Sequence, residues 1–261
     1  MTKQEQIKFI EDNYPEYTNH FSKRSIRHDF FSEIKTELQA YLLGFYAADG
    51  SINEKRKTLR IHLCDVDSDI VNMYKTYISQ DARTFILQEH ITTGRNGMKV
   101  QAHKSYGIDI TSTKLCESLV NLGFGYNKTY VEHSFPKMDP SLFRHFIRGY
   151  FDGDGSITGS YRKAQENRKE RMTMNFTIDF KKAQLALEFQ KEFARRDIKS
   201  SVIYLKRDDM YRLTTAYIPN IKKLFHFLYD DCNFYGNRKY KKFSYYVNTE
   251  VSQLIADHRN A

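Results

Sequence analysis

The sequence predicts an α+β fold built from two similar halves, each with the element order αββαββα. A twelve-residue stretch occurs twice, as YLLGFYAADGSI at 41–52 and as FIRGYFDGDGSI at 146–157. The patterns typical of strands and helices follow each copy in the same order. The interval between the copies is 105 positions, and the same interval separates Tyr106 from Tyr211. These observations indicate that one fold is duplicated within the chain.

The first copy lies at the end of a predicted helix, and alternating apolar residues then predict a strand over Thr58–Leu63. Gly94 to Gly97 is a turn signal between two further strands. In chain order we expect a helix over 33–49, strands within 51–64 joined at 53–57, a helix from Asp67 to Ile78, strands over 85–89 and 99–110, and a helix from Ser112 to Leu122 that ends at Gly123.

The second half repeats this order. In chain order we expect strands over 156–162 and 172–178 around a basic loop, a helix over 181–195, a hairpin of 202–205 and 211–214, a helix over 218–229 and one last basic, aromatic helix over about 237–257. The domain boundaries that follow are an N-terminal helical extension at 1–36, a first repeat at 37–135, a linker at 136–140 and a second repeat with its C-terminal helix at 141–261. Within the extension, Gln4–Asn13 is typical of a short helix.

Glycines in both copies predict close packing of two helices. Gly44 and Gly149 lie in helix interiors, where glycine costs about 1 kcal/mol relative to alanine. Small residues recur at intervals of four beside both glycines, so each helix presents a smooth face along which two backbones can touch. Gly50 and Gly155 come where the helices end, and we expect them in the left-handed conformation.

Each copy also ends in an acid. Asp49 and Asp154 lie at helix C-termini, where the helix dipole disfavours a carboxylate. If the two helices pack along their smooth faces, these carboxylates come close together and repel unless a cation lies between them. The alternative is that each Asp-Gly pair is only a turn after a helix, but two copies with matched glycines favour function.

The two copies resemble the paired motif of the LAGLIDADG homing endonucleases. Residues 42–50 and 147–155 fall on the nine motif positions, with Gly, Asp and Gly matched at the third, eighth and ninth. The resemblance implies a homing endonuclease-like fold: two pseudo-symmetric repeats that pack through the motif helices and form a DNA-binding β-saddle in one monomeric chain. The sixth position is Ala47 in the first copy and Asp152 in the second, so Asp152 is not a required catalytic group by this analogy.

The resemblance also implies the site residues. The metal-binding acids of the family correspond to Asp49 and Asp154, to which we add Gly50 and Gly155, and the metal is expected to be Mg²⁺ or another divalent cation such as Mn²⁺. The family often uses one lysine from each repeat, and the best matches are Lys128 and Lys239, although each could be an ordinary surface lysine beside a turn. Asp65 and Asp179 are expected either to surround the acids as polar neighbours or to act as helix N-caps.

Basic residues follow the predicted strands and their loops. The chain has 41 Lys and Arg against 32 Asp and Glu, a formal net charge of +9, which suits a nucleic acid partner but is also compatible with a basic solvated surface. Strands can enter the major groove while Lys and Arg hold phosphates. The residues expected to bind DNA are Lys55, Arg56, Lys57, Arg60, Arg95, Lys99, Lys104, Arg162, Arg168, Lys169, Arg171, Lys206 and Arg212.

The leading hypothesis is a site-specific double-strand DNA endonuclease that hydrolyses phosphodiester bonds with a divalent metal. An RNA-splicing maturase, with intron RNA as partner, or a non-cleaving DNA-binding protein on the same fold is the alternative. Both acids are retained, which favours cleavage. An intein is disfavoured by the first and last residues of the chain, and the histidines show no metal-ligand spacing.

The remaining sequence features bear on cellular location. The longest apolar run falls short of 18 residues, so we expect no membrane span. The beginning of the chain has no apolar signal region, so we expect a protein that is cytoplasmic, nucleoid-associated or organellar rather than secreted. Three widely spaced cysteines, Cys64, Cys116 and Cys232, are expected to be reduced core residues.

Overall fold

The structure, a computed structural model, describes residues 26–93, 97–164 and 169–259. The described chain forms two compact units: the residues up to Ser32 with Ser51–Ser118 form unit 1, and Glu33–Gly50 with the residues from Leu119 onward form unit 2. The predicted helix over Gln4–Asn13, most of the predicted extension, and the predicted DNA-binding residues Arg95 and Arg168 lie outside the described residues.

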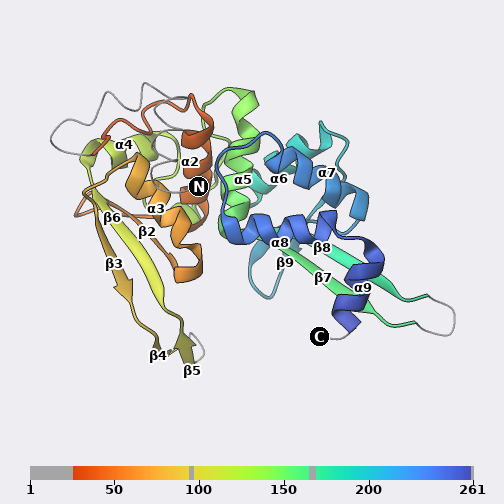
Figure 1. Cartoon of the computed structure of the whole chain (residues 1–261). Coiled ribbons are helices and arrows are strands. Elements are labelled where there is room, and N and C mark those ends of the chain that lie inside the picture. The colour runs from red at the N-terminus through yellow and green to blue at the C-terminus, as the bar shows by residue number, and fades with distance from the viewer. Residues whose placement is uncertain (1–25, 94–96, 165–168, 260–261) are drawn as a thin grey trace. The chain divides into compact units, whose positions relative to one another are not determined.

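Unit 1 is a four-stranded antiparallel sheet with helices on one face. Its strand order is β1-β2-β6-β3, and a separate two-stranded ribbon, β4-β5, extends from it (Figure 1). Its elements are β1 (Ser51–Asn53), β2 (Thr58–Cys64), the 3₁₀ turn η2 (Asp65–Asp67), α3 (Ser68–Tyr77), β3 (Arg83–Leu87), β4 (His90–Thr93), β5 (Lys99–Ala102), β6 (Ser105–Thr111) and α4 (Thr113–Asn121), whose last turn belongs to unit 2.

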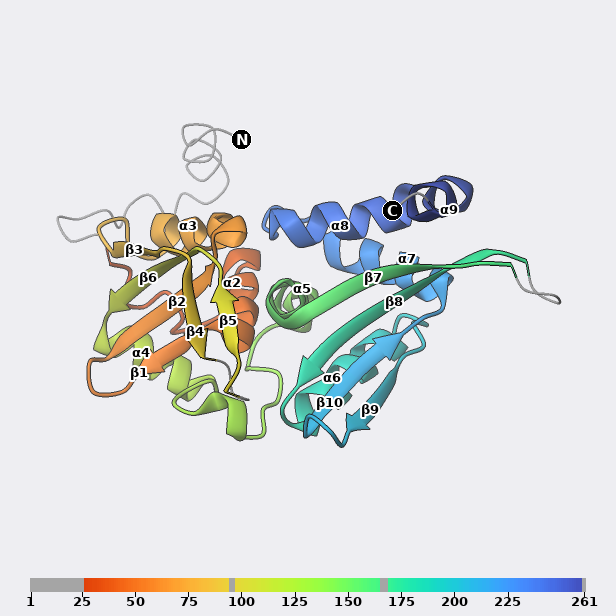
Figure 2. The same cartoon turned by 90° about the horizontal axis from the view of Figure 1, so that it is seen from below.

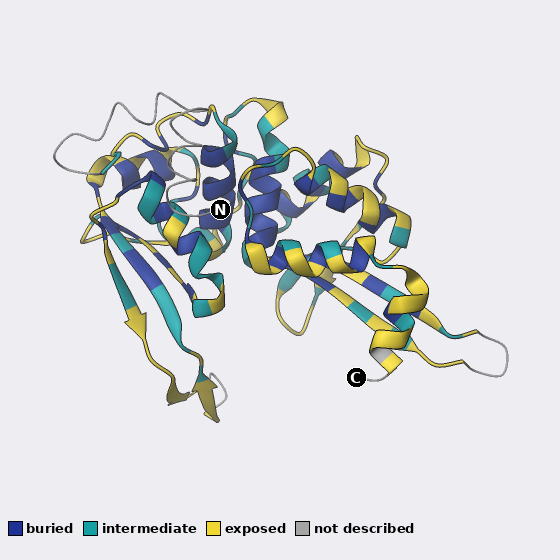
Figure 3. Cartoon of the chain, viewed as in Figure 1, coloured by how far each residue is buried: buried dark blue, intermediate teal, exposed yellow. Residues whose placement is uncertain are grey.

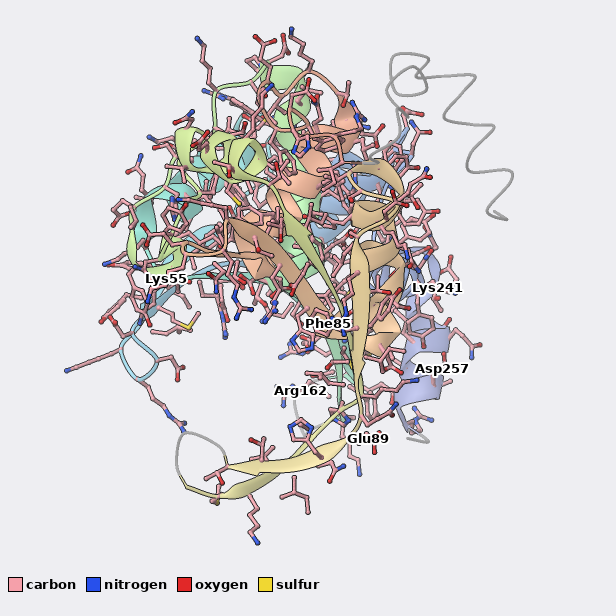
Figure 4. The ribbon with its side chains drawn as sticks, turned by 90° about the vertical axis from the view of Figure 1, so that its left-hand side faces the viewer. Lys55, Phe85, Glu89, Arg162, Lys241 and Asp257 are labelled. Carbon is pink, nitrogen blue, oxygen red and sulfur yellow. The ribbon has the colours of Figure 1, made fainter. Side chains whose placement is uncertain are left out.

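The predicted alternation along β2 is confirmed. Leu59 and Ile61 are fully buried, whereas Arg60 and His62 point to the opposite, open face. Helix α3 packs on the buried face. On the open face the ring of Phe85, labelled in Figure 4, lies over β6 and approaches Arg60 and His62, with 5.3 Å between the ring centroid and either group.

Unit 2 contains both motif helices and a second four-stranded antiparallel sheet of order β7-β8-β10-β9 (Figure 2). This order matches that of unit 1, which supports duplication of one fold. Its elements are α2 (Glu37–Asp49), η3 (Lys128–Tyr130), η4 (Pro140–Leu142), α5 (Phe143–Asp154), β7 (Gly155–Arg162), β8 (Arg171–Phe180), α6 (Ala183–Ala194), β9 (Ser201–Leu205), β10 (Met210–Thr215), α7 (Ile218–Tyr229), α8 (Asn237–Asn248) and α9 (Val251–Arg259).

The two motif helices, α2 and α5, lie side by side and are buried where they meet (Figure 3). An added Cβ at Gly44 would lie 2.0 Å from the carbonyl oxygen of Phe146, and one at Gly149 would lie 2.0 Å from that of Tyr41. The backbones are therefore in contact, and any side chain at these two positions would push them apart. This packing was predicted from the small residues and is confirmed.

The expected left-handed conformation of Gly50 and Gly155 is wrong. Both residues are extended, with φ of −76° and −83°. Glycine is needed there for space, because an added Cβ would lie 2.1 Å from the ring of Tyr46 in one case and of Phe151 in the other. The chain thus leaves each helix directly into a strand while an aromatic ring of the last turn covers the junction.

Two smaller expectations are also corrected. The single helix expected over 237–257 is two helices, because Thr249 is extended and lets α9 turn so that Leu254 is fully buried. Of the three cysteines, all free, only Cys116 is buried; Cys64 ends β2 at an outward position of its alternation. Within the described residues, no helix is both long and apolar enough to cross a membrane.

The compact units do not follow the predicted repeat boundaries. Helix α2 opens the first repeat in sequence but packs against α5 of the second, so it belongs to unit 2. The boundaries at 37, 136 and 141 mark the repeats in the sequence, not the compact units, and they stay a prediction.

Candidate functional site

The two motif acids meet at the C-terminal ends of the packed helices. Asp49 is the last residue of α2, and Asp154 is the last residue of α5. An added Cβ at Gly153 would lie 3.1 Å from Oδ2 of Asp49, so the first acid lies against the last turn of the other helix. The packing that Gly44 and Gly149 permit therefore brings the acids of both repeats into one site.

Each acid influences the charge of the other. The pKa of Asp154 is raised to about 6, first by desolvation in the dense protein around it and then by the negative charge of Asp49. Asp154 nevertheless keeps exposed surface, so a ligand from solvent can reach it. Lys128 and Lys239 act in the opposite direction and lower this pKa. Two acids crowded in this way form a site that favours a bound cation.

Lys128 is held beside the end of α2. It opens the η3 turn, and its Nζ donates hydrogen bonds to the carbonyl oxygens of Ala47 at 2.7 Å and Ala48 at 3.0 Å. Burial lowers the pKa of Lys128 to about 8, while the charges of Asp154 and Asp49 raise it. At neutral pH the lysine is therefore still a cation, aimed at the residues directly before the first acid.

Lys239 occupies the matching place beside the end of α5. It lies in the first turn of α8, and its Nζ contacts the carbonyl oxygens of Phe151, Gly153 and Gly155. Only 8% of Lys239 is exposed. The ammonium groups also lie over matched rings, Lys128 over Tyr46 at 5.7 Å and Lys239 over Phe151 at 5.5 Å.

The structure thus places both predicted lysines at the site, Lys128 against the last turn of α2 and Lys239 against the last turn of α5. Neither is an ordinary surface lysine: Lys128 is largely enclosed, and Lys239 is buried. Their catalytic role stays a prediction.

The two predicted polar neighbours differ. Asp179 on β8 contributes to the raised pKa of Asp154 and forms a two-bonded ion pair with Arg212, with N–O distances of 2.6 and 2.7 Å. Asp65 lies in unit 1, where its carboxylate pairs with Lys104 at 3.7 Å. Neither residue occupies the N-cap of the helix that follows, a position taken by Lys182 before α6 and Asp67 before α3.

Tyr150 belongs to this site and was not predicted. Its hydroxyl pKa is raised well above the usual value by burial and by the charges of Asp154, Asp49 and Asp179. Tyr150 lies one helical turn before Asp154 on α5, and that spacing is the sequence signal that could have identified it. The matching residue of the first copy is Phe45, so the first motif supplies no hydroxyl at this position.

Most predicted DNA-binding residues lie on the open faces and loops of the two sheets. Arg60 is paired with Asp109 at 2.6 Å across β2 and β6, as Arg212 is with Asp179, so these two arginines already have carboxylate partners. Lys55, labelled in Figure 4, lies in the β1–β2 turn, and Arg162 at the end of β7. The exposed members of the set are Lys55, Arg56, Arg60, Lys99, Arg162, Lys169, Arg171 and Lys206, while Lys57, Lys104 and Arg212 are half-buried.

The donors at the site fit a divalent cation. Carboxylate oxygens suit Mg²⁺, which commonly takes one or two carboxylates and completes its coordination with water and substrate phosphates. Among the described residues there is no group of three or more His, Cys, Asp or Glu that could hold a metal ion. Asp49 and Asp154 are a pair of carboxylates, which would leave further coordination positions of a bound cation for other ligands. Gly155, also expected to contribute, has its carbonyl oxygen bonded by Lys239.

Comparisons with known proteins identify similar domains and similar structures. A family model described as a LAGLIDADG-like domain matches residues 142–226. The crystal structure of the LAGLIDADG meganuclease I-CpaMI bound to uncleaved DNA aligns with a TM-score of 0.55 over 85% of this chain and 98% of that one, at 14% identity. The chain has the LAGLIDADG fold. The meganuclease I-AabMI bound to uncleaved DNA gives a TM-score of 0.54 over 84% of this chain and 96% of that one, at 11% identity.

One curated relative is similar in sequence to part of this chain. The DNA-directed RNA polymerase subunit Rpo1C of Methanocaldococcus jannaschii is 26% identical over 132 residues. That match covers 50% of this chain and only 14% of the polymerase subunit. The two-motif organisation expected from the sequence agrees with the fold.

The raised pKa of Asp154 has a consequence for stability that can be measured. Between the ordinary Asp value of about 4 and the folded value of about 6, the native state binds more protons than the unfolded state, so stability falls as pH rises. Asp154→Asn should therefore raise the Tm of the metal-free protein at pH 8, and the difference should shrink toward pH 4. Thermal unfolding with chelator present measures this.

The control for this prediction is Asp208→Asn, which removes one exposed carboxylate from the β9–β10 turn. A Tm difference for Asp154→Asn that is absent at pH 8, or that grows as the pH falls, would contradict the raised pKa of Asp154.

Proposed function

We propose that this protein is a site-specific DNA endonuclease of the homing type that cuts both strands of a double-stranded target. The observation that carries the proposal is the convergence of Asp49 and Asp154 at the ends of two backbone-packed helices, with the half-buried Lys128 against one helix end and the buried Lys239 against the other. The meganuclease structures with the same fold are described as bound to DNA. A protein that only binds DNA has no need of two mutually repelling acids.

Asp49 and Asp154 would hold a divalent cation, Mg²⁺ or Mn²⁺. When bound, such a cation neutralises negative charge on a phosphodiester and lowers the pKa of a bound water molecule. The chain's own groups hold the two carboxylates near each other, and both keep exposed surface that a substrate can reach. Because both acids come from one chain, we infer that a monomer suffices.

The lysines and Asp179 complete this arrangement. Lys128 and Lys239 place positive charge close to the acids and can stabilise the extra negative charge that develops on the phosphate during attack. Asp179 pairs with Arg212, whose side chain is partly exposed and whose remaining N–H groups can donate to phosphate.

The open faces of the two sheets would bind the target. In unit 2 this face carries short polar side chains, as at Thr173, Asn175 and Thr177 on β8, between basic residues. Such side chains can hydrogen bond to base edges, while Lys and Arg neutralise phosphates.

Binding is expected to weaken steeply with salt. Each phosphate that a Lys or Arg neutralises contributes about −0.9 to the slope of log K against log salt concentration. With six or more such contacts the affinity should fall by about 10³-fold between 50 and 200 mM salt. Titration of labelled duplex at several salt concentrations measures the slope, and a flat response would count against the basic sheet faces as the binding surface.

The proposal is tested by a cleavage assay on DNA that spans the insertion junction of the protein's own gene with the insert removed. We expect cutting at one site with Mg²⁺ and none with chelator. Tight binding of this DNA or of the intron RNA without cutting would favour a maturase or a non-cleaving binding protein, and cutting that persists in chelator would contradict the metal.

A further inference from the structure

The segment that carries Lys239 into the site is held by buried polar side chains of both motif helices. This segment, residues 228–236, runs from the end of α7 to the start of α8. Arg148 of α5 is fully buried, and it donates from Nη1 to the carbonyl oxygen of Leu228 and from Nε to that of Phe234, both at 2.8 Å. Two points of the segment are therefore fixed to one side chain.

Asp152 of α5 fixes the same segment at two more points. Its Oδ1 accepts a hydrogen bond from the hydroxyl of Tyr229 at 2.7 Å, and its Oδ2 accepts one from the backbone N–H of Gly236 at 2.7 Å. The hydroxyl of Tyr41 on α2 donates to Oδ2 at 2.9 Å. Asp152 is only 4% exposed. A carboxylate so buried requires these donors, since an unpaired one would cost several kcal/mol.

Glu37 in the first turn of α2 completes the set. Its Oε1 accepts from the backbone N–H of Asn233 at 2.8 Å and from Nη2 of Arg148 at 2.7 Å, and its Oε2 accepts from the side chain of Asn233 at 3.0 Å. Both motif helices therefore hold the segment in place.

The bond to Gly236 links this arrangement to the site. Gly236 is the N-cap of α8, and Lys239 is the third residue of that helix. A shift of the helix start moves the Lys239 ammonium relative to the carbonyl oxygens of Gly153 and Gly155, which flank Asp154. Misplacement by about 1 Å can cost a reaction on the order of 100-fold.

The first motif helix lacks the two polar side chains that form this arrangement. The residues 105 positions before Asp152 and Arg148 are Ala47 and Leu43, which have no polar side-chain atoms. There the hydroxyl of Tyr46 donates to the carbonyl oxygen of Phe124 at 2.9 Å, four residues before Lys128. The two lysines therefore reach similar places by different supports.

We propose that Asp152 is a positioning residue for cleavage, which acts through Lys239 by fixing Gly236 and Tyr229. This inference rests on the proposed function and adds to it a role for the motif's sixth position in the second copy. According to this inference, the placement of Lys239 depends on Asp152, whereas the placement of Lys128 does not.

A double-mutant cycle on the full chain tests this dependence. Asp152→Asn keeps the side-chain volume but replaces one of the two acceptor oxygens with a donor nitrogen, so the side chain can no longer accept from both Gly236 and Tyr229. Single-turnover cleavage should slow by about 10- to 100-fold in the otherwise wild-type protein. In the Lys239→Met background the same change should slow cleavage by less than about threefold, because residues that act as a unit are not additive.

Lys128→Met provides the matched background, in which Asp152→Asn should keep its full effect. A merely structural role for Asp152 would give equal effects in both lysine backgrounds, and that result would overturn the proposal. Thermal unfolding of each variant should show the same loss of Tm from Asp152→Asn in all backgrounds. If Asp152→Asn does not fold, Tyr229→Phe can replace it in the double-mutant cycle. This substitution removes the hydrogen bond from the Tyr229 hydroxyl to Asp152.

Tyr41→Phe removes a hydrogen bond to the same carboxylate from α2 instead of from the segment. It should slow cleavage less than Tyr229→Phe does, and the reverse order would contradict a role through the segment. Failure of the wild-type protein to cut DNA would overturn the proposed function together with this inference. Equal effects in an active protein would overturn the inference alone.

Discussion

Asp49→Asn and Asp154→Asn are each expected to reduce double-strand cleavage on the order of 100-fold or more, with DNA affinity unchanged or slightly tighter. Asparagine keeps the size of the side chain but loses the charge that would hold a divalent cation. Because the two carboxylates share one crowded site, loss of either should be severe. The removal of a negative charge leaves the basic sheet faces intact, and binding should persist.

The measurement is cleavage of labelled duplex in Mg²⁺, with both strands followed separately and with affinity measured in Ca²⁺ or chelator. Accumulation of DNA nicked in one strand would indicate that each acid serves mainly one strand. Asp208→Asn is the matched control, since it makes the same chemical change at an exposed turn. Double-strand cutting at the wild-type rate by either acid variant would contradict the assignment of both acids to the site.

Gly149→Ala is expected to destabilise unit 2 strongly. Its Cβ would lie 2.0 Å from the carbonyl oxygen of Tyr41 and 2.8 Å from the backbone nitrogen of Phe45, so α2 and α5 must separate. Overpacking of this kind costs about 1–3 kcal/mol and more where backbone must move, which outweighs the roughly 1 kcal/mol gained in helix propensity. The Tm should fall on the order of 5 °C or more.

Separation of the helices should also reduce cleavage, because the acids lie at their shared end. Gly44→Ala should behave in the same way, as its Cβ would lie 2.0 Å from the carbonyl oxygen of Phe146. The control is Lys191→Ala on the exposed face of α6, with an expected change within about 0.5 kcal/mol. A Tm for Gly149→Ala equal to or above that of the wild-type protein would contradict the backbone contact between α2 and α5.

The sequence by itself determined the duplication, the order of elements and the pair of acids. These properties are local or repeated: a glycine inside a helix, an Asp at its end and alternating apolar residues in the strands can each be recognised within a few positions. The matching strand orders of the two sheets agree with the interval that separates the repeats.

Tertiary structure alone decided how the site is supported. The buried role of Asp152 depends on donors from Tyr41, Tyr229 and Gly236, which are far apart in sequence and meet only when α7 and α8 pack on the motif helices. The need for glycine at position 50 likewise depends on the position of the Tyr46 ring, which leaves no space for a Cβ there. Periodicity indicates which face of an element is buried, but the partner across that face is chosen by packing, and this is why the acids could be identified from the sequence while their supports could not.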